Sequence, residues 1–327
     1  MRARLLLASF GGAASLAVGA RALSDRVATI PLATSLSSPA RPTTVLVHGL
    51  DSSKETWSGV LADLATRGYP AIAVDLRGHG ESPLGAPDEF GPRALSRDVL
   101  SAVAAAGVPR PYVLVGHSMG GRIAMRAAAD DAVAVRGGAA ANFAAVVIED
   151  MCVSTRDGAA PLADDAARAA VDGFSKPGGR RFASWEAARA AILPFYGDEP
   201  RVDSWKGKRV RAAPGGGSWW SDINPAAQRL ARDTVLASSD GDEAWTTLAD
   251  GKVPFEVHCW YADEPGTVCR HAGPGGLDDM RRRLPAAKFL LFEGSAHSIH
   301  NSARVAFVDA LCAVVDDAAR RAVSDDP

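Results

Sequence analysis

Cysteine is scarce in this chain of 327 residues, and its four copies do not cluster. No C-x-x-C pair occurs, which argues against a disulfide framework and against a zinc finger. The pairs at 258–259 and 269–271 combine histidine with cysteine and could be drawn as a metal quartet, but scattered residues of these types are usually explained by packing. The cysteines are Cys152, Cys259, Cys269 and Cys312.

The chain also lacks a clear excess of positive or negative charge. Lysine and arginine number 36 and aspartate and glutamate 38, so the formal net charge is −2. No overall field therefore draws the chain to nucleic acid or to anionic lipid. The phosphate-binding patterns G-x-G-x-x-G and G-x-x-x-x-G-K-[ST] do not occur either, which agrees with a protein that uses no nucleotide cofactor.

The apolar stretch near the N-terminus is too short for a membrane anchor. It covers Leu5–Ala20 and is interrupted by Gly11 and Gly12, so we expect no stable membrane span. The surrounding segment is rich in arginine and serine and holds no acid before Asp25, which is typical of an organelle transit peptide. We expect residues 1–40 to be a targeting leader, for a mitochondrion rather than a chloroplast. The alternatives are a secretory signal and an N-terminal segment without a targeting function.

Strand and helix patterns alternate after the leader. Short apolar, β-branched runs end in glycine-rich loops, and helical spacing follows each of them. The sequence predicts strands at 43–49, 70–75, 112–116 and 143–150, and helices at 57–68, 93–108 and 121–130. This alternation predicts an α/β fold whose mostly parallel sheet has helices on both faces.

Residues 151–252 interrupt the alternation. They contain helical pieces separated by glycine- and proline-rich loops, and the alternation resumes in 253–327. We predict one core, built from 41–150 and 253–327, with 151–252 inserted as a helical lid. Five of the seven tryptophans fall in this insertion: Trp185, Trp205, Trp219, Trp220 and Trp245.

The segment "VLVGHSMGG" (113–121) has the pattern of a nucleophile elbow. A nucleophilic serine on a sharp strand-to-helix turn needs small residues two positions before and two after it. Gly116 and Gly120 meet this demand around Ser118, and Gly121 allows the helix to approach closely. A glycine-rich turn with an idle serine is the alternative.

Four motifs in order carry a family resemblance. They are "HGLDSS" (48–53), "DLRGHGES" (75–82), "GHSMGG" (116–121) and "GSAHSIH" (294–300). In these motifs the chain resembles the α/β-hydrolase superfamily, and in particular its small bacterial and mitochondrial esterases. The resemblance covers most of the chain outside the leader and the insertion.

The resemblance implies a role for each matching residue. Ser118 corresponds to the nucleophile and His297 to the base, since an imidazole can take the serine proton and return it to the leaving group. The oxyanion hole would use the backbone N–H groups of Leu50 and Met119. No metal and no organic cofactor is implied. The remaining histidines of the motifs match positions that are not the base: His48, His79, His117 and His300.

The acid of the triad is less well defined than the other members. Most of the family places it in a G-x-x-D loop after the strand that follows the insertion, where this chain has Ala262 in place of the glycine. The esterases that share "HSMGG" place it one strand earlier, which corresponds to Asp150. We favour Asp150, with Glu264 as the main alternative and with Asp263 and Glu149 also open.

The expected activity is acyl transfer to water. Ser118 would attack an ester or thioester of a small molecule, and a tryptophan-rich lid favours an apolar acyl group, although such a lid also needs large side chains for its own packing. One alternative is another reaction on the same triad, such as C–C hydrolysis, a lyase step or perhydrolysis. The other is a non-catalytic protein that binds a small ligand.

Overall fold

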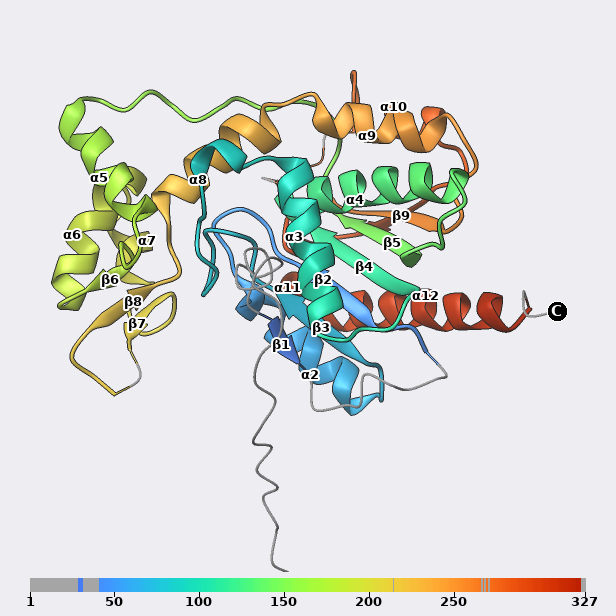
Figure 1. The fold of residues 1–327 in the computed structure, drawn as a ribbon, viewed down its shortest axis with the longest axis horizontal. Helices are drawn as coiled ribbons and strands as arrows, with labels where there is room; N and C mark the ends of the chain where they lie inside the picture. Colours follow the sequence, from blue (N-terminus) through green and yellow to red (C-terminus); the bar gives the residue numbers. More distant parts are fainter. Residues whose placement is uncertain are drawn as a thin grey trace, which may run out of the picture.

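A seven-stranded sheet forms the centre of the computed structural model, which describes residues 29–31, 41–213, 215–265, 267, 269 and 271–324 (Figure 1). Its strand order is β1-β3-β2-β4-β5-β9-β10, and β1 (Thr29–Pro31) is antiparallel to β3. The other strands run parallel, which confirms the predicted sheet. They are β2 (Thr44–Val47), β3 (Ala71–Val74), β4 (Tyr112–His117), β5 (Phe143–Glu149), β9 (Glu256–Ala262) and β10 (Lys288–Phe292).

Most of the expected leader, residues 1–40, lies outside the described residues. The exception is β1, whose three residues pair with residues 72–74 of β3 at the edge of the sheet. The targeting role of this segment therefore stays a prediction. Among the helices of the described part of the chain, none has both the length and the apolar character that crossing a membrane requires.

Helices cover both faces of the sheet, as predicted. On one face α2 (Ser58–Thr66) and α12 (Arg304–Ser324) pack together, and on the other α3 (Pro92–Ala105) packs on α4 (Met119–Arg136) (Figure 1). The alternation of side chains along a strand supplies both apolar cores, since Leu46 faces α2 and α12 while its neighbours Val45 and Val47 face the other layer.

The loops that matter for function leave the same edge of this sheet. Because the strands are parallel, the loops after β2, β4, β5 and β10 all begin at carboxyl ends, which meet at one edge. These loops carry the motifs of the sequence. The short elements that complete the core are η1 (Lys54–Trp57), η2 (Pro87–Glu89), α10 (Leu277–Arg283) and α11 (Ile299–Ser302).

The insertion is not purely helical. It contains a three-stranded antiparallel sheet of order β6-β8-β7, which the helical patterns did not predict because its strands are only two or three residues long. This sheet and three helices lie to one side of the main sheet (Figure 1). The elements are α5 (Asp165–Ser175), β6 (Arg181–Phe182), α6 (Trp185–Tyr196), α7 (Glu199–Asp203), β7 (Val210–Ala212) and β8 (Trp219–Ser221).

The last part of the insertion packs against the helices that cover the main sheet. It comprises α8 (Pro225–Ala231), a π-helical turn η3 (Arg232–Leu236) and α9 (Asp240–Ala249). α9 packs along α4, and Asp240 forms an ion pair of 2.8 Å with the buried Arg126 of that helix. Because α8 also packs on α5, it connects this last part to the part of 151–252 that precedes it, which we call the lid.

The tryptophans of the insertion serve its packing. The rings of Trp185 and Trp219 lie 6.2 Å apart and those of Tyr196 and Trp205 lie 5.0 Å apart, all within the lid. Trp245 on α9 is fully buried, and its indole N–H donates to the carbonyl of Met280 on α10 over 3.1 Å. These contacts explain the large side chains without a substrate.

We expect Trp245→Phe to destabilise the fold more than Trp57→Phe. Both indoles are completely buried, but only Trp245 donates a hydrogen bond, whereas the indole N–H of Trp57 is buried without a partner among the described residues. The free energy of unfolding from denaturant titrations should fall further for Trp245→Phe by about 1 kcal/mol. Equal losses for the two variants would contradict this role of the Trp245 hydrogen bond.

Candidate active site

Ser118 occupies a strained turn between β4 and α4. Its backbone angles are φ 53° and ψ −118°, a conformation that costs a non-glycine residue about 1–3 kcal/mol and persists only where the surroundings enforce it. The backbone N–H of Ser118 donates to the carbonyl of Glu149 over 2.9 Å, which ties the turn to the end of β5. This is the geometry that the G-x-S-x-G pattern predicts.

The glycines around Ser118 have no room for a side chain. A Cβ atom on Gly116 would lie 2.2 Å from the carbonyl oxygen of Gly120, and one on Gly120 would lie 2.6 Å from the carbonyl oxygens of Val47 and His48. On Gly121 it would meet Met151 Cβ at 3.1 Å. Strand, turn and helix therefore approach one another as closely as backbones can.

The loop after β2 lies against the serine. A Cβ atom on Gly49 would lie 3.0 Å from Ser118 Cβ, so Leu50, the next residue, follows directly beside the turn. His48 fixes this loop, since its Nδ1 lies 2.8 Å from the carbonyl of Gly49 and its Nε2 accepts the N–H of Leu76 over 3.1 Å. Burial holds the pKa of His48 well below its usual value, so the ring is neutral, as these two bonds require.

His297 and Asp150 come together from loops that are far apart in the sequence. His297 Nδ1 lies 2.6 Å from Asp150 Oδ2, and the carboxylate of Asp150 is completely buried. Asp150 follows β5 directly, with φ 43°, and its N–H donates to the carbonyl of Trp260 over 2.7 Å. Its second oxygen, Oδ1, accepts the N–H of Ala262 over 3.2 Å. The neighbouring strand β9 thus orients the carboxylate toward His297.

The other acids considered from the sequence have different contacts. Asp263 accepts the backbone N–H of Gly294 over 2.7 Å and so supports the turn before His297. Glu149 binds His300. Glu264 is exposed, and its backbone N–H donates to the carbonyl of Ser295 over 3.1 Å. In the described part of the chain, Asp150 is the carboxylate that contacts His297.

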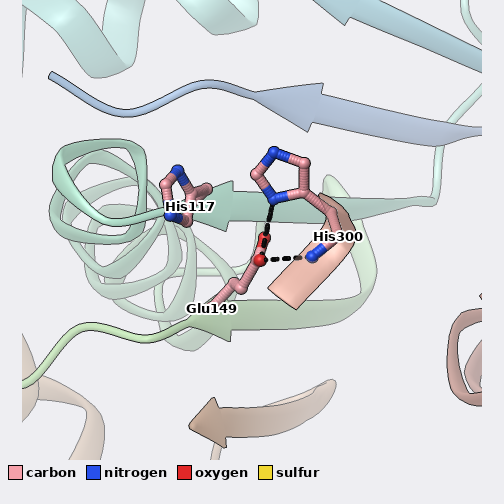
Figure 2. Close-up of side chains that lie close together, drawn as sticks. All are labelled: His117, Glu149 and His300. Atoms are coloured by element: carbon pink, nitrogen blue, oxygen red, sulfur yellow. Dashed lines mark hydrogen bonds and ion pairs between the residues drawn. The ribbon is translucent and has the colours of Figure 1, made fainter. Parts of the chain in front are cut away.

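A second histidine–carboxylate pair lies beside the first. His300 Nδ1 is 2.8 Å from Glu149 Oε1, and the backbone N–H of His300 donates to the same oxygen over 2.9 Å (Figure 2). His117, the residue before Ser118, packs its ring against both His297 and His300, with centroids 4.7 and 4.8 Å away. The sequence did not predict this pair, since it gave His300 no role and left Glu149 as one of the possible acids of the triad.

His117, Glu149 and His300 are the described residues that come nearest to a metal site. One potential ligand atom from each lies within 4.8 Å of the others. However, Glu149 already accepts two hydrogen bonds from His300, and His117 Nε2 lies 3.1 Å from the carbonyl of His297. Glu149 and both ring nitrogens of His300 are thus satisfied without an ion, whereas Nδ1 of His117 is buried without a hydrogen-bond partner among the described residues.

The quartet of histidines and cysteines drawn from the sequence does not assemble. His258 lies 3.1 Å from Glu256 of its own strand, and the ring of His271 packs edge-on against Tyr261. The cysteines at 259 and 269 are buried free thiols. Packing therefore explains these residues.

The lid reaches down to the loop that carries Leu50. The hydroxyl of Tyr196, the last residue of α6, donates to Asp51 over 2.8 Å. A hollow of about 590 Å³ lies between residues 51–56 of this loop and the lid, where Lys208, Arg209 and Arg211 line it. Ser118 and His297 are not among the residues that line this hollow.

The sheet order, the strained Ser118 and the His297–Asp150 contact can be compared with known proteins. The profile of the alpha/beta hydrolase family matches residues 44–310. The chain belongs to this family. The match includes the insertion as well as both parts of the core.

Curated relatives resemble a short part of the chain. It is 36% identical over 95 residues to protein phosphatase methylesterase 1 of Homo sapiens, a match that covers 28% of this chain and 25% of the relative. It is 41% identical over 87 residues to 2-succinyl-6-hydroxy-2,4-cyclohexadiene-1-carboxylate synthase of Pectobacterium atrosepticum, covering 27% and 32%. The chain thus spans only about a quarter to a third of these relatives.

Solved structures share the fold over nearly the whole chain. A marine microorganism esterase superposes with a TM-score of 0.59 at 15% identity, covering 89% of this chain and all of the other. A thioesterase domain from the curacin biosynthetic pathway superposes with a TM-score of 0.57 at 19% identity, covering 88% and 94%. At these identities the likeness establishes the alpha/beta hydrolase fold.

Gly116→Ala should disrupt the turn at Ser118. The added methyl group would lie 2.2 Å from the Gly120 carbonyl oxygen, so strand and helix must separate, and we expect a loss of about 3 kcal/mol or more in unfolding free energy. Gly91→Ala is the control, since its Cβ would meet nothing within 4 Å, and should stay within about 0.5 kcal/mol. Denaturant titration measures both. A Gly116→Ala protein as stable as Gly91→Ala would contradict the close approach.

Burial of His117 should make the fold sensitive to acid. Burial lowers the pKa of His117 to about 3, whereas the unfolded chain binds a proton near the ordinary value of 6.5. Stability is therefore complete above pH 6.5 and falls as the pH drops toward 3, by up to about 1.4 kcal/mol per pH unit from this group. His117→Gln should lower the slope of unfolding free energy against pH between 4 and 6 by that amount. An unchanged slope would refute a neutral His117.

Proposed function

We propose that the chain is a serine hydrolase that cleaves a carboxylic ester or thioester through an acyl-enzyme. The observation that carries the proposal is the 2.6 Å contact between His297 Nδ1 and the buried Asp150 carboxylate, next to a serine on a strained turn. A nucleophile, a base and a group that orients the base are what such a reaction requires.

Each side chain then has one task in the reaction. Asp150 holds His297 in the tautomer with its proton on Nδ1, which leaves Nε2 free to accept the proton of Ser118 Oγ. Ser118 Oγ bonds to the carbonyl carbon, and His297 passes the proton to the departing alcohol or thiol as the ester bond breaks. A water activated by the same histidine then hydrolyses the acyl-enzyme and restores Ser118.

The negative charge of the intermediate needs donors beside Ser118. We assign this task to the backbone N–H groups of Leu50 and Met119. Two observations support the assignment: Gly49 lies directly against Ser118, and Met119 is the first residue of α4, where the helix dipole favours negative charge.

The proposed substrate is a small ester or thioester that enters beneath the lid. The hollow of about 590 Å³ beside Asp51 has the size of small-ligand sites. An esterase and a thioesterase are among the solved structures with this fold, and a methylesterase is among the curated relatives. We keep an apolar acyl group as the expectation, although the lid tryptophans are already explained by packing.

A second candidate is a non-hydrolytic reaction of the same side chains. The chain is 41% identical to a synthase in one matched segment, which favours this candidate over a protein that only binds a small ligand. In that case His297 and Ser118 would move protons on a bound substrate without forming an acyl-enzyme. Labelling of Ser118 by a fluorophosphonate together with no turnover of any ester or thioester would support it.

Hydrolysis of p-nitrophenyl esters and acyl thioesters of graded chain length tests the first proposal. We expect turnover by the wild type, a loss of at least about 1,000-fold for Ser118→Ala and a loss of about 100-fold or more for Asp150→Asn. Glu264→Gln is the matched control among the acids and should keep its activity within about twofold. An inactive Glu264→Gln with an active Asp150→Asn would reassign the acid of the triad.

A further inference from the structure

Two consecutive acids at the end of β5 hold two histidines of one turn. Glu149 contacts His300 and Asp150 contacts His297, so the segments 149–150 and 297–300 are joined by two parallel carboxylate–histidine contacts. Only the second contact belongs to the proposed triad. The first contact is fully buried and has no part in the chemistry described above, which raises the question of what it does.

The Glu149–His300 pair is built more rigidly than a surface ion pair. Neither side chain is exposed, and Glu149 accepts from both the ring and the backbone of His300 (Figure 2). The far nitrogen of the ring, Nε2, lies 2.9 Å from Thr56 Oγ1, and the ring packs on Trp57 with centroids 4.1 Å apart. His300 is thus held at both nitrogens, at its ring face and at its backbone.

The ionised state of Glu149 stabilises its contact with His300. Burial alone would raise the pKa of Glu149, but His300, which donates to it from ring and backbone, lowers it by more, so the pKa lies below its ordinary value and the carboxylate is ionised. A buried carboxylate without these partners would be costly, so the position of His300 is strongly determined.

Hydrogen bonds also hold the backbone of the turn at His297. His117 Nε2 lies 3.1 Å from the carbonyl of His297, and the ring of His117 is neutral, so Nε2–H donates to that oxygen. On the other side the N–H of Ala296 donates to Ser302 Oγ over 3.1 Å. Glu149 therefore anchors the turn three residues after His297, and His117 and Ser302 hold its backbone.

We propose that Glu149 and His300 are positioning residues that set the orientation of His297 toward Asp150 and Ser118. This inference rests on the proposed serine hydrolase. Because Glu149 and Asp150 are adjacent in one chain, and His297 and His300 share one turn, formation of the buried pair places the ring of His297 at a fixed distance from Asp150. The His297 ring is 28% exposed and lacks the enclosure of His300, so it depends on this anchor.

The test compares kcat, KM and stability for three variants and one control. Glu149→Ala removes the anchor, Glu149→Gln retains an oxygen for the backbone N–H of His300, and Thr56→Val removes only the partner of His300 Nε2. Asp240→Asn is the matched control, because it also replaces a carboxylate that contacts a buried side chain, here Arg126, but between α4 and α9. All assays are run well below the melting temperature of each variant.

The positioning role predicts a specific kinetic pattern. We expect kcat to fall by about 10- to 100-fold for Glu149→Ala, the loss that a misplaced reacting group causes, with KM within about threefold. Glu149→Gln should recover part of this loss, and Thr56→Val should lose only about threefold. Asp240→Asn should lose stability while its kcat stays within about twofold.

A spectroscopic signal reports on His297 without any substrate. The proton between His297 Nδ1 and Asp150 should give a resonance far downfield in the proton NMR spectrum, identified by its loss in Asp150→Asn. We expect this resonance to shift or broaden in Glu149→Ala and in Thr56→Val, and to stay unchanged in Asp240→Asn. If Glu149→Ala does not fold, Glu149→Gln and Thr56→Val decide the question.

Unchanged kcat and an unchanged resonance in the folded Glu149 and Thr56 variants would overturn the positioning role and leave the pair a stabilising contact. A wild type that hydrolyses no ester or thioester would instead overturn the proposed function. In that case the resonance still shows whether Glu149 and His300 orient His297, so the two failures are distinguishable.

Discussion

The hydrogen bond between His297 Nδ1 and Asp150 Oδ2 joins residues that are 147 positions apart, and the rest of the site is arranged around it. This bond connects the loop after β5 to the loop after β10 at the carboxyl edge of the sheet. The N–H of Ser118 binds the carbonyl of Glu149, the residue before Asp150, so the serine turn and the acid depend on the same strand end. Displacement of this strand end would move nucleophile, base and acid together.

Close backbone packing makes that arrangement possible. The glycines at 116 and 120 bring β4, α4 and the loop after β2 to distances that exclude any side chain. The strain at Ser118 and the positive φ of Asp150 are compensated by contacts on every side, which is the usual condition for keeping such conformations at a functional site. The buried contact between Glu149 and His300 fixes the same turn three residues after His297.

Hydrogen bonds connect the lid to two loops of the core. Tyr196 binds Asp51, beside the proposed oxyanion donor Leu50, and Arg180 donates to the carbonyls of Gly80 and Ser82 in the loop after β3. These contacts hold the lid on two loops of the same sheet edge. Aromatic side chains of the lid pack against one another, so the number of tryptophans does not indicate the chemistry of the substrate.

The sequence by itself determined the parallel sheet, the helices on both faces, the elbow at Ser118 and the loop position of His297. These features depend on local patterns, namely apolar periodicity and the glycine spacing that a tight turn requires. The partner of His297 could not be read from such patterns. The resemblance favoured Asp150 but left acids at two different strand ends open, and only the meeting of β5, β9 and β10 brings Asp150 to the ring. The same holds for the short strands of the lid, which are stabilised by their mutual pairing. Tertiary structure alone decided that Glu149 binds His300, since this buried contact depends on side chains that enter from two distant segments.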